Sequence, residues 1–302
     1  MITMKDEINL YLDLERMSAD TEGTISHKFA NEMMNKYPQI RVNNIYSKIG
    51  ELRLKKSPQE VEKIKKAIEI TKSGIEKLMT ECRSGMKEYE LEAYFDFNCK
   101  IKGATDLAFT TIAAAGKNAT TLHYVENNSK LKDGDLILFD LGAEYNCYNA
   151  DITRTFPISG KFTERQKEVY NSVLKVNEEI INLIKPGMKY KDINEKATDL
   201  IAEECIKLGL IKDKSEVRKY YYHSIGHSLG MDTHDIETPH RDIIFEPGVV
   251  FTVEPGIYIQ EEGIGIRIED DILVTNEGVI NLSSDIIKNV DDIENFMNKF
   301  TK

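Results

Sequence analysis

The stretch Leu136-Ile137-Leu138-Phe139-Asp140 runs four apolar residues directly into a carboxylate. The turn residues Lys132-Asp133-Gly134 precede it, so the pattern predicts a buried strand over residues 135–142. An ionised carboxylate in a buried strand is costly unless a cation or hydrogen bonds compensate for its lost hydration. Asp151 follows shortly afterwards, and a hairpin of this length would bring both carboxylates to one point.

The same pattern appears in the last third of the chain. Glu254 ends the apolar run 249–253, and Glu269 ends the strand-like run 264–268. The two glutamates flank a second predicted hairpin, with its turn near Glu261-Glu262-Gly263. A single strand carboxylate is more often a cap or an ion-pair partner. Four of them in matching places indicate instead that they bind metal cations together.

Helices separate these strand regions. Ser57-Pro58-Gln59-Glu60 offers an N-cap, a proline at the first helical position and a capping-box glutamate, which together predict a helix start. Further predicted helices and strands cover residues 88–101, 107–115, 163–184, 190–208 and 248 onward. The order is helix, helix, strands, twice over. We therefore expect an α+β fold whose two pseudo-symmetric halves face each other across the carboxylates.

Histidines supply the remaining candidate ligand. His223 and His227 lie close together in the sequence, and His234 follows them. An oxygen-rich set with one imidazole suits a pair of divalent ions such as Mn, Co, Zn or Fe. His123 is ambiguous on spacing alone, and His240 is assigned a structural role, which is the commoner one for a single histidine. The predicted metal ligands are Asp140, Asp151, His227, Glu254 and Glu269.

One motif suggests different chemistry. Gly226-His227-Ser228-Leu229-Gly230 matches the nucleophile elbow of serine hydrolases. The only later histidines, His234 and His240, follow too soon for a triad of that layout. We therefore expect no serine-hydrolase reaction.

Composition excludes several partners. The chain has 302 residues, 41% of them hydrophobic, and a formal net charge of -11, so we expect neither nucleic acid nor an anionic membrane surface to bind it. No apolar run approaches the ~18 residues that span a bilayer. Met1 to Glu7 lack the basic and apolar regions of a signal peptide, and the four cysteines are scattered. These features predict a cytoplasmic protein with reduced, mostly buried thiols.

Five motifs, taken in order, resemble one family. They are Asp140-Leu141-Gly142-Ala143-Glu144-Tyr145, Asp151-Ile152-Thr153-Arg154-Thr155-Phe156, Gly226-His227-Ser228-Leu229-Gly230, Thr252-Val253-Glu254-Pro255-Gly256 and Gly265-Ile266-Arg267-Ile268-Glu269-Asp270. Together they resemble the M24 "pita-bread" metallopeptidases, over residues 57–297. Within that family they look most like the bacterial Xaa-Pro aminopeptidases (aminopeptidase P). The resemblance implies the pita-bread fold.

The resemblance also implies roles for single residues. The family's five ligands, which bind two divalent metal ions, fall on Asp140, Asp151, His227, Glu254 and Glu269. Manganese (Mn²⁺) is the expected metal, with Co²⁺ or Zn²⁺ as alternatives. The family's active-site residues fall on His123, His223, His234, Glu254 and Arg267, and Tyr258 matches a position that supports the ligands. The implied reaction removes the first residue from peptides with proline in second position, by a hydroxide that bridges two metals.

Two alternatives and one departure accompany this interpretation. A prolidase restricted to Xaa-Pro dipeptides is the nearest alternative, and a weakly active or non-catalytic binding relative belongs to a different class. Residues 1–56 are expected to be the remnant of an N-terminal creatinase-like domain, ahead of a catalytic domain over residues 57–302. In the family that domain borders the substrate cleft and helps form the oligomer. Whether this chain forms a homo-oligomer is therefore left open.

Overall fold

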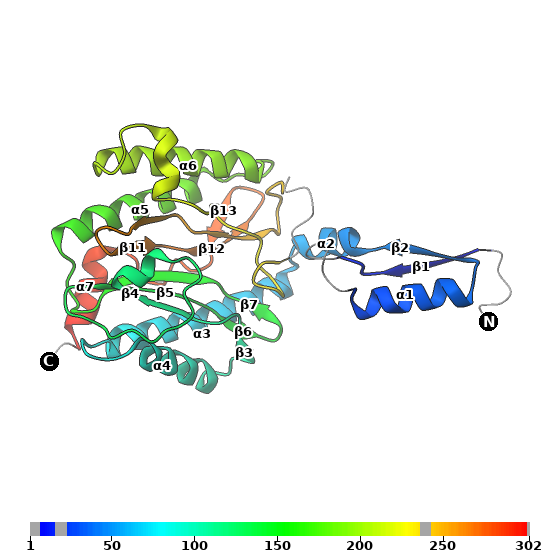
Figure 1. The fold of residues 1–302 in the computed structure, drawn as a ribbon, viewed down its shortest axis with the longest axis horizontal. Coiled ribbons are helices and arrows are strands. Elements are labelled where there is room, and N and C mark those ends of the chain that lie inside the picture. Colours follow the sequence, from blue (N-terminus) through cyan, green and yellow to red (C-terminus); the bar gives the residue numbers. More distant parts are fainter. Residues whose placement is uncertain (1–6, 16–22, 236–242, 301–302) are drawn as a thin grey trace. The chain divides into compact units, whose positions relative to one another are not determined.

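The computed structural model describes residues 7–15, 23–235 and 243–300, so His240 lies outside the described residues. Contacts divide the described chain into two units, with the division after Arg53 (Figure 1). The smaller unit precedes this division and the larger unit follows it. The assignment of residues 1–56 as the remnant of a larger domain stays a prediction.

The smaller unit is a strand–helix–strand arrangement. β1 (Ile8–Leu12) and β2 (Ile40–Asn44) pair in parallel, and α1 (Ile25–Lys36) makes the crossover that parallel strands need. α2 (Tyr46–Leu54) leads into the larger unit. The alternation over residues 6–14 predicts a strand and residues 25–36 predict a helix, and the structure has a strand and a helix in these regions.

The larger unit begins with two long helices, α3 (Pro58–Glu81) and α4 (Glu88–Ile101). The predicted capping box is present at the start of α3, because Glu60 accepts the Ser57 N–H at 2.7 Å and Ser57 Oγ accepts the Glu60 N–H at 3.4 Å. Both helix predictions are confirmed.

The predicted single strand over residues 107–115 is wrong. The chain forms two short strands there, β3 (Asp106–Leu107) and β4 (Ile112–Ala115), which belong to different sheets. The break arises because β3 pairs with β6 (Ala143–Tyr145), whereas β4 pairs with β5 (Leu136–Leu141). Residues 108–111 carry the chain from one sheet to the other.

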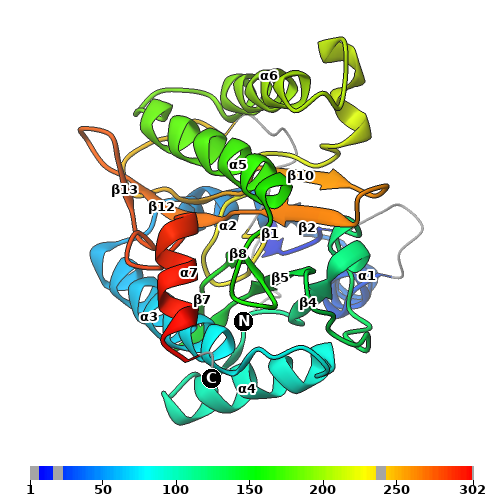
Figure 2. The same cartoon turned by 90° about the vertical axis from the view of Figure 1, so that its left-hand side faces the viewer.

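The second half repeats the order of the first. α5 (Glu164–Leu183) and α6 (Tyr190–Lys207) occupy the predicted helical regions, and Figure 2 shows them on the opposite side of the strands from α3 and α4. The remaining elements are η2 (Gly116–Thr120), β7 (Tyr148–Asn149), β8 (Ile152–Pro157), η3 (Lys214–Lys219), β9 (Val250–Val253), β10 (Gly256–Ile259), β11 (Ile264–Arg267), β12 (Asp270–Val274), β13 (Val279–Asn281) and α7 (Val290–Asn298). The predicted α+β class with two related halves is confirmed.

The strands between the helix pairs form the frame of the candidate site. β5 lies between β4 and β8, and β12 lies between β13 and β9. β10 and β11 form the predicted hairpin, with Gly256 opposite Arg267. Among the described residues, no helix is both long and apolar enough to cross a membrane.

Candidate metal centre

The first pair of predicted ligands lies at one end of the β5–β8 pair. Asp140 belongs to β5, opposite Thr153 of β8, and Asp151 directly precedes β8. Gly142 allows this end of the pair to close, because a Cβ there would collide with the Ala150 carbonyl oxygen. The predicted hairpin therefore brings both carboxylates to the same edge.

The second pair is placed in the same way. Glu254 directly follows β9 and Glu269 directly precedes β12, and these strands are antiparallel with Val253 opposite Asp270. The Glu269 N–H donates to the Thr153 carbonyl at 3.1 Å. This bond joins the second half of the molecule to the first at the carboxylates.

Three predicted ligands converge directly. One ligand atom from each of Asp151, His227 and Glu269 lies within 4.8 Å of the others. His227 Nε2 is 3.3 Å from Asp151 Oδ2 and 3.9 Å from Glu254 Oε1. Three of the four predicted carboxylate ligands thus lie around one edge of the His227 imidazole.

Arg267 links Asp140 to this cluster. Its Nη2 donates to Asp140 Oδ2 at 2.6 Å, and its Nε donates to Thr153 Oγ1 at 3.0 Å. Thr153 Oγ1 in turn donates to Glu269 Oε2 at 2.7 Å. Arg267 Nη1 donates to the Tyr258 hydroxyl at 3.0 Å, so Tyr258 also belongs to this network.

Two of the three predicted active-site histidines contact the cluster. His223 Nε2 lies 2.8 Å from the Tyr258 hydroxyl, and its Nδ1 lies 3.8 Å from Glu254 Oε2. The His234 ring lies against the His227 ring, with 4.2 Å between centroids. His123 is exposed, and no hydrogen bond, ion pair or ring contact joins it to these groups among the described residues. It follows Thr120 by three residues, and the Thr120 carbonyl accepts the hydroxyl of Tyr222, whose ring lies against that of Tyr258.

The cluster carries more negative charge than its surroundings compensate. Burial raises the pKa values of Asp151 and Glu269 well above their ordinary range, and the repulsion of neighbouring carboxylates adds to it. Burial also raises the pKa of Glu254 to about 7. Asp140 Oδ1 is buried and has no hydrogen-bond partner in the part of the chain that the structure describes. Hard oxygen donors that are buried and close to one another fit a divalent cation, which would offset their mutual repulsion.

Two residues of the site are not among the sequence predictions. Thr153 connects Arg267 to Glu269, as described above. Asp271 is fully buried, and its Oδ2 accepts the Asp151 N–H at 3.2 Å. Both lie inside the quoted motifs or directly beside them, so proximity to a predicted ligand was the available signal.

Residues 62–276 match the model of the metallopeptidase family M24. The chain belongs to this family. M24 membership implies a divalent metal, which agrees with the donor set. A rat protein named Xaa-Pro aminopeptidase 3 is 40% identical over 268 residues, covering 84% of this chain and 53% of its own length. The Xaa-Pro aminopeptidase of Escherichia coli is 40% identical over 266 residues, covering 82% of this chain and 60% of the relative.

Solved structures agree with these relatives. The E. coli aminopeptidase P structure superposes with a TM-score of 0.89 at 35% identity, covering 97% of this chain and 71% of that one. The predicted pita-bread fold is confirmed. The chain spans about half the length of the rat relative, so the activity of the whole protein is treated below as a proposal.

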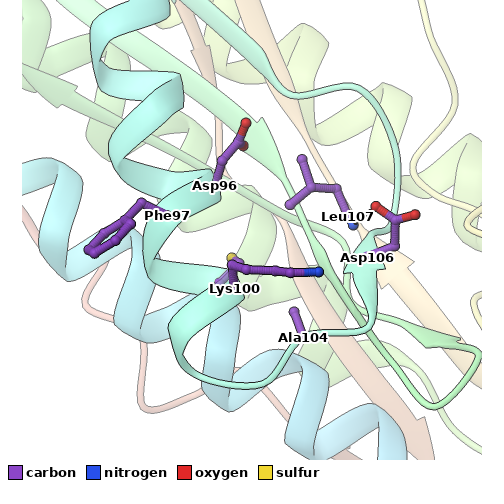
Figure 3. A pocket seen from close by; sticks show the side chains of 7 residues that line it. Asp96, Phe97, Lys100, Ala104, Asp106 and Leu107 are labelled. Carbon is purple, nitrogen blue, oxygen red and sulfur yellow. Dashed lines mark hydrogen bonds between the residues drawn. The ribbon is translucent and has the colours of Figure 1, made fainter.

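Two surface hollows differ in their relation to the centre. One of about 410 Å³, shown in Figure 3, lies between α4 and β3 and contains none of the predicted site residues; its lining includes Asp96, Phe97, Lys100, Ala104, Asp106 and Leu107. The other, of about 310 Å³, is lined in part by Tyr258, Tyr222 and Thr120. Because Tyr258 contacts Arg267 and His223, only this second hollow adjoins the candidate centre.

Proposed function

We propose that this chain acts as an Xaa-Pro aminopeptidase, which removes the first residue from peptides with proline in second position. The observation that carries the proposal is the convergence of the carboxylates on His227 in a chain of the M24 family. The names of the relatives support the proline specificity. A cytoplasmic location stays a prediction, and the oligomeric state stays open.

Asp140, Asp151, His227, Glu254 and Glu269 would hold two divalent ions, with Mn²⁺ as the proposed metal. When bound, two such ions lower the pKa of water toward neutrality and so supply hydroxide for peptide hydrolysis. Arg267 keeps Asp140 in place through the 2.6 Å hydrogen bond. Asp140 Oδ1 has no hydrogen-bond partner among the described residues and would be available as a ligand.

The side chains around the ligands supply the other steps. Glu254 is proposed to carry a proton on its carboxylate to the proline nitrogen as that nitrogen leaves. His223 and His234 are proposed to hold the scissile carbonyl and to stabilise the charge that develops on its oxygen. His123 would complete this set from the exposed side. The hollow beside Tyr258 is proposed to hold part of the peptide.

The test measures release of the first residue from an Xaa-Pro-Xaa tripeptide, before and after exhaustive chelation and after return of Mn²⁺. We expect activity to disappear with the metal and to return with about two ions per chain by elemental analysis. Asp151→Asn and Glu269→Gln should each abolish activity. Glu204→Gln is the matched control, because Glu204 is a carboxylate paired with Lys175 and Lys207 away from the centre.

The same assay separates the alternatives. Cleavage of Xaa-Pro dipeptides without cleavage of tripeptides would establish a prolidase. Binding of metal and peptide without turnover would establish a binding relative. Full activity in the chelated protein would refute the metal-dependent reaction.

A further inference from the structure

Glu88 is a fully buried carboxylate outside the metal centre. Its Oε1 accepts the Ala115 N–H at 2.8 Å and the Asn118 side-chain amide at 2.9 Å. Its Oε2 accepts the Tyr124 hydroxyl and the Ser129 N–H, each at 2.8 Å. These hydrogen bonds to a charged acceptor compensate for its desolvation.

All of these donors belong to one segment, residues 115–129, which also carries His123. Apart from Ala115, the last residue of β4, and the short helix η2, this segment lacks regular structure up to residue 129. The first part of the segment is also bonded to Tyr222, whose hydroxyl donates to the Thr120 carbonyl at 2.5 Å. Asn127 fixes its far end by accepting the Ala113 N–H at 3.0 Å. Between these attachments, Tyr124 is the residue directly beside His123, and its hydroxyl is held by Glu88.

We propose that Glu88 is a positioning residue for His123, an inference that rests on the catalytic role proposed for His123. By holding donors on both sides of His123 at one buried point, Glu88 fixes the path of the irregular segment. A small displacement of a catalytic group is sufficient to cost about 100-fold in rate. The function of Glu88 is therefore to limit the positions that His123 can occupy.

Glu88→Gln tests this with little change in shape. The glutamine amide nitrogen replaces one carboxylate oxygen, so two of the four donors face another donor in either orientation. The Glu88 N–H still donates to the Ser129 carbonyl at 3.1 Å, which keeps the segment attached to α4. Glu90→Gln is the matched control, because Glu90 lies in the same first turn, accepts the Lys87 N–H and has no hydrogen bond to the segment among the described residues.

The variants are compared in the wild-type and His123→Ala backgrounds, in the metal-loaded full chain. We expect Glu88→Gln to lower kcat/KM about 10- to 100-fold in the wild-type background. In the His123→Ala background, the further loss should be under about 2-fold, because the group that Glu88 positions is already gone. Hydrogen exchange should show faster exchange of the Ala115 and Ser129 amides in Glu88→Gln, and Glu90→Gln should match wild type in both measurements.

If Glu88→Gln does not fold, Tyr124→Phe removes a single donor to Glu88. It should give the same pattern of kcat/KM losses in the two backgrounds, with smaller fold-changes. Equal fold-losses in both backgrounds would overturn the inference, since they indicate a general structural effect. If Glu88→Gln has wild-type kinetics while His123→Ala is impaired, the role inferred for Glu88 is overturned and that of His123 stands. A fully active His123→Ala would overturn the role of His123, and the inference with it.

Discussion

Arg154 offers the sharpest test of how the backbone around the candidate metal ligands is stabilised. Its guanidinium is 0% exposed and pairs with Asp270, also 0% exposed, at 2.7 Å. Its other bonds go to carbonyl groups, including that of Glu269 at 2.6 Å and that of Thr153 at 2.9 Å. One side chain therefore holds the backbone of a predicted ligand and of the threonine that contacts it.

Arg154→Lys keeps the charge but loses the planar arrangement of donors. The guanidinium also donates to the carbonyls of Ile286 and Ile287, at 3.3 and 3.2 Å. A lysine ammonium has three donors on one atom, so at least two of the five hydrogen bonds that Arg154 makes among the described residues are lost. Each hydrogen bond from a charged donor contributes about 1.5–3 kcal/mol, so the free energy of unfolding should fall by about 4 kcal/mol.

Urea unfolding of the metal-free protein, followed by circular dichroism, measures this loss. Titration calorimetry should also show Mn²⁺ affinity reduced by about 10- to 100-fold, because the Glu269 backbone is no longer held. Arg165→Lys is the control, since Arg165 pairs with Glu262 at the surface and should lose no more than about 1 kcal/mol. A loss under about 1 kcal/mol in Arg154→Lys would refute the reasoning.

Three further predictions concern the larger unit. Lys56 and Asp235 form a buried ion pair at 2.9 Å. Lys56→Met leaves Asp235 without this partner and should lower the free energy of unfolding by about 3–5 kcal/mol. A urea midpoint equal to that of wild type would contradict this prediction. Cys147 is the exposed thiol and should react with a thiol reagent in the native protein. The other cysteines should react only after unfolding, because burial raises the pKa of each to about 12. More than one rapidly reacting thiol per native chain would contradict this prediction. Finally, scanning calorimetry of the metal-free protein should show stability falling from about pH 6.5 to pH 8, through the carboxylates of the centre.

The helices and the clustering of the carboxylates were predictable because their signals are local. A capping box at Ser57 and apolar residues at helical spacing determine where α3 begins and which face is buried. The carboxylates stood out because each interrupts or ends an apolar strand, where an unpaired charge is costly. These signals do not depend on knowing the partner strands.

The remaining features depend on contacts between distant segments. The break between β3 and β4 follows from pairing with different strands, which residues 107–115 do not encode by themselves. Glu88 looks like an ordinary first-turn glutamate until the segment over residues 115–129 folds onto it. Ser228 shows the converse, because its elbow-like motif holds a hydroxyl that is buried and donates to the Asp235 carbonyl at 2.6 Å. A nucleophile would have to be accessible, so the rejection of serine-hydrolase chemistry agrees with this geometry.

The pH dependence of stability follows from the direction of each pKa shift. Burial raises the pKa of Glu254 from 4.5 to about 7, so the folded metal-free protein retains a proton that the unfolded chain has lost. The resulting stabilisation is present at low pH and is lost as the pH rises through about 7, and Asp151 and Glu269 shift in the same direction. His223 acts in the opposite sense only below its ordinary value of 6.5, because burial lowers its pKa to about 3. Above pH 6.5 the carboxylates therefore dominate among these groups, and Glu254→Gln should flatten the decline. Because a divalent cation needs the ionised carboxylates, Mn²⁺ should release protons on binding and restore most stability at pH 8. A metal-free protein that gains stability between pH 6.5 and pH 8 would show that these carboxylates are already compensated by something other than a metal.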